Sequence, residues 1–172
     1  MPTNEPPVTL PPMPLGRQVV EDYRSTGLSL RGHPVSFLRA ALDQQRIVRS
    51  ADLLTTRDGR RLAVAGIVLV RQRPGSARGV LFVTIEDETG HANLIVWPSV
   101  FERQRRLLLS ATMLACHGKV QREGEVIHVI ADRLADLSEM LRGVGQGASP
   151  PQDARDIHTQ RSGIKVPTRD FR

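Results

Sequence analysis

Side chains able to stack on nucleic-acid bases are scarce in this sequence, because aromatic residues make up only 3% of it. Phe82 and Trp97 fall in two consecutive apolar segments, and Thr84 and Asn93 occupy matching positions of the same alternation. If both segments are strands, a period of two places these four side chains on one face. The rings would then stack bases, while the hydroxyl and the amide would hydrogen-bond base edges.

A second set of candidates is basic and flanks the expected hairpin turns, where cationic side chains can clamp phosphates. The alternative is a solvated basic loop. The net charge of +6 favours a polyanionic partner only weakly, since residues 62–137 carry nine basic and eight acidic residues. The basic candidates are Arg71, Arg73 and Arg78 around one turn, and Lys119 and Arg122 beside another.

Residues for independent catalysis are not grouped in the sequence. The five histidines are scattered, and the single cysteine, Cys116, excludes both a disulfide framework and a multi-cysteine zinc site. Gly75–Gly79 lacks the ending of a phosphate-binding loop. Glu86-Asp87-Glu88 has the residue types for a metal, but a carboxylate-rich turn is usually only a turn. We expect no catalytic residue, no metal and no cofactor.

The elements that must position these residues follow an order typical of one β fold. Alternating or β-branched-rich runs separated by glycine-containing turns predict five strands, and Pro98 opens a short helix between the third and the fourth. Gly66 inside the first strand indicates a bulge or a tight bend. The fold class is therefore mainly β with N-terminal helices: an OB-fold, a five-stranded Greek-key barrel with flexible tails. The predicted strands are residues 62–73, 80–85, 92–97, 112–121 and 126–134.

Composition divides the chain into four parts. Prolines make the first part an extended linker, and helices near 16–25 and 34–45 form a connector. Those helices offer an alternative for Phe82 and Trp97, which would then lie beneath them as an extended core. No run is long enough to span a bilayer and no secretory signal is evident, so we expect a soluble cytoplasmic protein. The parts are a linker at 1–14, a helical connector at 15–61, an OB-fold domain at 62–141 and a flexible tail at 142–172.

Several longer segments have a more distinctive sequence, namely residues 22–39, 64–77, 82–90, 96–98, 118–128 and 168–172. Together they resemble the C-terminal region of bacterial family C DNA polymerases, in the error-prone, damage-tolerant branch. The similarity runs from about Pro11 to Leu141, with a weaker match at the extreme C-terminus. The run Arg71-Gln72-Arg73-Pro74-Gly75-Ser76-Ala77, taken with the segments downstream, is its most specific part.

The resemblance implies a single-stranded-DNA-binding module of an error-prone polymerase that acts in DNA damage tolerance and translesion synthesis. It also implies partners: a RecA-like accessory protein and an inactive Y-family-like polymerase subunit. Neither the metal-binding residues of the family's PHP domain nor its palm carboxylates have a counterpart here, so polymerase activity is not expected of the chain. The chain is then a fragment, a separately encoded subunit or a non-catalytic remnant. The alternative function is a module that docks the partner proteins.

Overall fold

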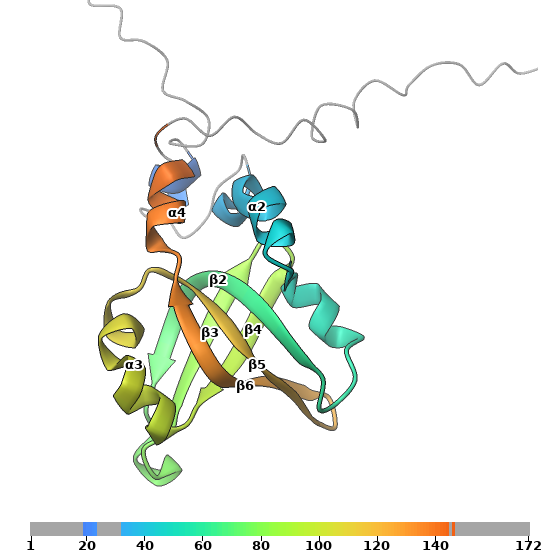
Figure 1. Cartoon of the computed structure of the whole chain (residues 1–172), viewed down its shortest axis with the longest axis vertical. Helices are drawn as coiled ribbons and strands as arrows, with labels where there is room; N and C mark the ends of the chain where they lie inside the picture. The colour runs from blue at the N-terminus through green and yellow to red at the C-terminus, as the bar shows by residue number, and fades with distance from the viewer. Residues whose placement is uncertain (1–18, 24–31, 145, 147–172) are drawn as a thin grey trace, which may run out of the picture.

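The computed structural model describes residues 19–23, 32–144 and 146. Within them the chain forms a closed barrel with helices above one end and against one side (Figure 1). The barrel strands are β2 (Arg61–Gln72), β3 (Leu81–Asp87), β4 (Gly90–Val96), β5 (Met113–Glu123) and β6 (Val126–Asp136). The other elements are η1 (Pro34–Leu38), α2 (Arg39–Gln44), β1 (Ile47–Val48), η2 (Ser50–Leu54), η3 (Gly75–Ala77), α3 (Pro98–Ser110) and α4 (Ser138–Val144).

The strand pairing closes the barrel. β2 pairs antiparallel with both β3 and β5, while β4 pairs antiparallel with β3 and parallel with β6. β5 and β6 form the last antiparallel pair. The two-residue strand β1 adds to β2 in parallel. With α3 between the third and fourth barrel strands, the predicted OB-fold is confirmed.

Alternation in the sequence decides which side chains fill the barrel. Leu81, Val83 and Ile85 are buried inside it, whereas the residues between them point outward. α3 begins at Pro98, because the first residue of a helix needs no N–H donor for an intrahelical hydrogen bond. It packs Phe101 and Leu108 into the barrel core. The expected helix after the third strand is therefore confirmed.

Gly66 is required by a close approach of two backbones. A Cβ atom on this residue would lie 2.5 Å from the carbonyl oxygen of Glu86, so a side chain has no room there. The register between β2 and β3 then shifts between Val68 and Val70. The glycine predicted a bulge or a bend, and the irregularity lies just beyond it in the strand.

A second core lies outside the barrel, on the face shared by β2 and β5. Ala65 and Met113 are buried there beneath Val35 and Leu42, which come from η1 and α2. Residues 19–23 are helical, so both predicted N-terminal helices have helical counterparts among the described residues. The expectation did not include α4, which packs on η1 (Figure 1).

The covered face corrects one alternative. The N-terminal helices cover the wall formed by β2 and β5, so Phe82 and Trp97 do not form an extended core beneath them. The linker at 1–14 and residues 147–172 of the predicted tail lie outside the described residues. Among the residues that the structure describes, no helix combines the length and the apolar character needed to cross a membrane.

Candidate nucleic-acid interface

The outer face of β3 and β4 brings three of the four predicted base-contacting residues together. Thr84 lies directly opposite Asn93, and Phe82 lies opposite Ile95. The Thr84 hydroxyl donates a hydrogen bond to Oδ1 of Asn93 at 3.0 Å. This bond orients the amide so that its NH2 group keeps its donors for another partner.

Phe82 and Trp97 border a hollow at the end of this face, which we call the aromatic hollow. Trp97 follows β4 at the N-cap of α3, and its side chain is 50% exposed. The hollow has a volume of about 560 Å³, and its charged lining is one arginine and one glutamate. It is therefore close to electrically neutral. Its lining residues are Ser76, Ala77, Arg78, Val80, Phe82, Ile95, Trp97, Pro98, Gln121 and Glu123.

Two of the predicted basic residues lie in the aromatic hollow or two strands away from β4 on the barrel wall. Arg78 lines the aromatic hollow and ends η3 in the left-handed conformation, with φ at 46°. Lys119 lies on the outer face of β5, opposite Ile130 of β6. Both side chains are exposed.

Arg73 lies at the edge of this region and has an aromatic partner of its own. Its guanidinium carbon is 4.8 Å from the centre of the Phe101 ring, a cation–π distance. Gly79 fits beside it, since a Cβ there would come within 3.3 Å of Nη2 of Arg73. The side chain remains exposed, so its edge can still donate to a phosphate.

The other two predicted arginines are directed elsewhere. Arg71 donates to the carbonyl oxygens of Leu108 and Ala111 at the end of α3, and burial lowers the pKa of its guanidinium. Arg122 donates to the carbonyl oxygen of Leu54. These donors satisfy backbone groups, so we leave both arginines out of the candidate interface.

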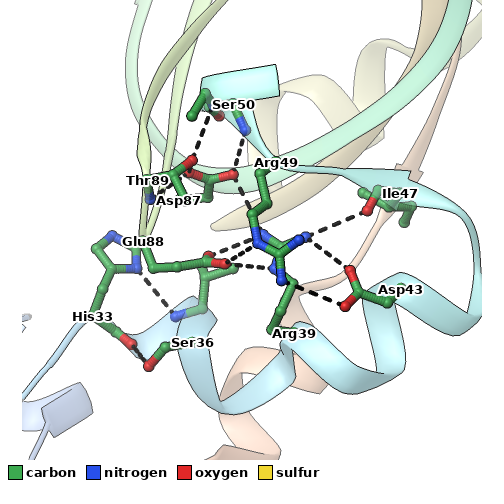
Figure 2. A network of polar contacts seen from close by, with 12 residues as sticks. His33, Ser36, Arg39, Asp43, Ile47, Arg49, Ser50, Asp87, Glu88 and Thr89 are labelled. Atoms are coloured by element: carbon green, nitrogen blue, oxygen red, sulfur yellow. Dashed lines mark hydrogen bonds and ion pairs between the residues drawn. The ribbon is translucent and has the colours of Figure 1, made fainter. Parts of the chain in front are cut away.

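The acidic turn between β3 and β4 binds the helical connector (Figure 2). Arg39 is 7% exposed, and its guanidinium donates to Glu88 at 2.5 and 2.9 Å and to Asp87 at 3.4 Å. Asp87 also accepts from the backbone N–H of Ser50 and from Thr89. Burial would raise the pKa of Asp87, but these hydrogen bonds outweigh it and hold the pKa below its ordinary value.

Glu86, the first acid of the same turn, is paired as well. Its carboxylate lies 3.4 Å from Nε2 of His33 and 3.2 Å from Nε2 of His91, and it accepts a hydrogen bond from Tyr23. Burial, followed by this carboxylate, raises the pKa of Tyr23. The three acids of this turn are thus engaged with the connector. Among the described residues, no cluster of three or more His, Cys, Asp or Glu side chains is arranged to hold a metal ion.

Cys116 and His117 point to opposite sides of β5, as adjacent strand residues must. Cys116 is buried inside the barrel, where burial, followed by the charge of Asp132, raises its pKa to about 12. The thiol is therefore protonated at neutral pH and is not a nucleophile.

This geometry defines the class of domain. The closed barrel with a helix between its third and fourth strands is an OB-fold, and residues 62–137 match the family described as an OB-fold nucleic acid binding domain. The matched range covers α3 and all five barrel strands, apart from the first residue of β2.

Most of the chain is homologous to one segment of error-prone DNA polymerases. It is 55% identical over 141 residues to the error-prone DNA polymerase of Allorhizobium ampelinum, a match that covers 82% of this chain and 13% of that protein. It is 46% identical over 171 residues to the enzyme of that name from Caulobacter vibrioides, covering 99% of this chain and 16% of that protein. The chain thus spans only a small part of the curated relatives that it matches.

The chain is also similar to a solved structure of an asparaginyl-tRNA synthetase from Pyrococcus horikoshii. The two are 20% identical in sequence, with a TM-score of 0.44. The match covers 53% of this chain and 22% of the synthetase chain.

Proposed function

We propose that this chain binds single-stranded DNA through the outer face of β3 and β4, with bases in the aromatic hollow. The observation that carries the proposal is a half-exposed Trp97 beside Phe82 in an open hollow on an OB-fold wall. Each stacked base contributes about 1–3 kcal/mol and every base has a π-face, so binding has little sequence preference. Arg73, Arg78 and Lys119 contact phosphates, while Thr84 and Asn93 contact base edges.

Homology extends the proposal to a biological role. We infer that the module belongs to an error-prone polymerase system of DNA damage tolerance in the bacterial cytoplasm, and that it holds template DNA rather than performing chemistry. A RecA-like accessory protein and an inactive Y-family-like polymerase subunit are the proposed protein partners. The near-neutral hollow, whose lining is mostly apolar apart from Arg78, Glu123 and two neutral polar residues, supports partner docking as the second candidate function.

Trp97 is the only tryptophan of the chain, so its fluorescence reports directly on the hollow. Titration with an oligothymidylate of about 8 nucleotides, within the ~4–16 of OB folds, is expected to quench it. Phe82→Leu keeps the apolar bulk and removes one π-face. We expect it to weaken binding by about 1–3 kcal/mol, which is about 5- to 150-fold.

The matched control is Leu109→Ala, which truncates an exposed apolar side chain on α3 outside the hollow. We expect this variant to bind as the wild type does. Raising salt from about 50 to about 200 mM separates the two candidate functions, because DNA binding weakens steeply and apolar docking does not. Unchanged Trp97 emission at saturating DNA, or equal affinities for Phe82→Leu and the wild type, would overturn the DNA-binding proposal.

A further inference from the structure

A second hollow, rich in arginine, lies elsewhere on the barrel wall. It has a volume of about 710 Å³ and shares no lining residue with the aromatic hollow. One wall is the connector at Gln45 and Val48, and the floor is the outer face of β2, β5 and β6. We call it the arginine hollow. Its charged residues are Arg46, Arg60, Arg61, Arg133 and Asp132.

The positive charges of this hollow are mostly unmatched. Asp132 pairs with Arg61. Among the described residues, no carboxylate pairs with Arg46, Arg60 or Arg133, and all three side chains are exposed. Guanidinium groups gathered in a concave surface produce a positive potential that an anion would neutralise. Their planar forks match phosphate oxygens in particular.

The backbone holds these residues in unusual conformations. His117 pairs with Arg133 and Gly118 with Ala131, so Asp132 is an extra, bulged residue in β6. A Cβ on Gly118 would lie 2.1 Å from the carbonyl oxygen of Ile130, so only glycine fits opposite the bulge. Bulges of this kind redirect side chains and are frequent beside functional sites.

Arg46 lies on the connector wall of the arginine hollow. Its φ is 58°, in the left-handed region that non-glycine residues rarely adopt. It follows α2, whose Arg39 is bound to the acidic turn of the barrel and also donates to the carbonyl oxygen of Ile47 at 3.3 Å. The docked connector therefore fixes Arg46 at the rim of the hollow.

The two hollows are linked by one row of directly paired, outward-facing residues. Phe82 pairs with Ile95, Ile95 with Ile130, Ile130 with Lys119, and Lys119 with Arg61. Neighbouring strands are about 4.8 Å apart, so Arg61 lies about 14 Å along the wall from Ile95. The only ionisable group between the hollows in this row is the ammonium of Lys119.

We propose that the arginine hollow binds the phosphate backbone of the same single strand whose bases stack in the aromatic hollow. The strand crosses β4, β6 and β5 over Ile130 and Lys119. This inference rests on the proposed function for the identity of the ligand. The division of tasks follows from charge: the aromatic hollow is nearly neutral and stacks bases, while the arginine hollow supplies cations for phosphates.

The test is the salt dependence of binding to a labelled oligothymidylate of about 14 nucleotides, long enough to reach both hollows. Arg60→Gln with Arg133→Gln removes two exposed charges from the arginine hollow. Each phosphate contact on a single strand contributes about 0.7 to the slope of log K against log salt, so the slope should fall by about 1.4. The control, Arg103→Gln with Arg106→Gln, removes two exposed charges from α3 and should leave the slope near the wild-type value.

A second measurement needs no variant. On addition of the oligonucleotide, the backbone amide signals of His117 and Arg133 should shift in a ¹⁵N-labelled wild-type chain. If the salt slopes of both double variants are equal, or the signals of these two residues do not move, the arginine hollow does not bind the phosphate backbone. This conclusion would hold even if Phe82→Leu weakens binding. Conversely, a lower salt slope for Arg60→Gln with Arg133→Gln, together with no effect of Phe82→Leu, would support phosphate binding at the arginine hollow. It would reject base stacking in the aromatic hollow.

Discussion

Arginines near the hairpin turns differ in what their guanidinium groups contact. Arg71 donates to carbonyls at the end of α3, and Arg122 donates to the carbonyl oxygen of Leu54. Arg73 lies over the Phe101 ring. Arg78 lines the aromatic hollow, and among the described residues nothing accepts from its side chain. One hairpin therefore carries an arginine bonded to the backbone, Arg71, and an arginine that we propose contacts a ligand, Arg78.

We predict opposite effects of substituting Arg71 and Arg78. Arg71→Gln removes charged hydrogen bonds to two carbonyls, so the free energy of unfolding should fall by about 1.5–3 kcal/mol. The salt slope of DNA binding should stay the same. Arg78→Gln should leave stability unchanged and lower that slope by about 0.7. Urea unfolding and a salt titration of binding measure the two effects, and a reversal of this pattern would exchange the roles assigned to the two residues.

Among the elements, the acidic turn between β3 and β4 organises the connector. Arg39 reaches Asp87 and Glu88, and its pKa is raised because their charges and hydrogen bonds outweigh burial, which alone would lower it. The same guanidinium binds the backbone at Ile47, just before η2 (Figure 2). One buried cation thus fixes α2, β1 and the acidic turn relative to one another.

Removing the buried guanidinium of Arg39 should destabilise the fold far more than removing the exposed guanidinium of Arg49. Arg39→Met keeps an apolar stem but leaves the Asp87 carboxylate buried without its cation, and we expect the free energy of unfolding to fall by about 3–5 kcal/mol. Arg49 lies in the same network, 3.8 Å from Glu88, but its side chain is 44% exposed. Arg49→Met should therefore lower the free energy of unfolding by at most about 1 kcal/mol. Urea denaturation compares the two variants, and similar losses would contradict the central role of Arg39.

The barrel was predictable because its signals are local. The alternation of Leu81, Val83 and Ile85 defines one strand and its inward face, and Pro98 marks the start of α3. β1 and α4 were not predicted. A two-residue strand carries no periodicity, and a seven-residue helix is stabilised by the neighbours it packs against rather than by its own sequence.

The candidate site was predictable only in part. Phe82, Thr84 and Asn93 share a face because strand alternation requires it, so this set could be found from the sequence. Whether Arg71 points to a ligand or to α3 depends on tertiary packing, which no local pattern encodes. The arginine hollow was missed for the same reason, since its members come from four separate segments. The glycine at 118 is the one local signal of the bulge in β6, because glycine inside a strand often marks a bulge or a close approach of two backbones.

For the whole molecule, the distribution of charge separates the two faces of the barrel. Residues 62–137 are nearly neutral in total, yet the acids of the turn at 86–88 are paired with the connector. The arginine hollow also contains Arg46, Arg60 and Arg61, which precede residue 62 and are not counted in that total. The total charge of the barrel therefore understates the potential that a phosphate backbone would meet on that wall.

The carboxylates of the described residues bear on whether this chain can catalyse nucleotidyl transfer. Nucleotidyl transfer by two metal ions needs carboxylates that are free to bind both. The densest group of acids among the described residues is Glu86, Asp87 and Glu88. Glu86 lies beside His33, and Asp87 and Glu88 pair with Arg39. We therefore expect the purified chain to extend no primer when supplied with template, magnesium and nucleotides. A known polymerase added to the same mixture should extend the primer, which excludes inhibition, and template-dependent incorporation by this chain alone would contradict the prediction.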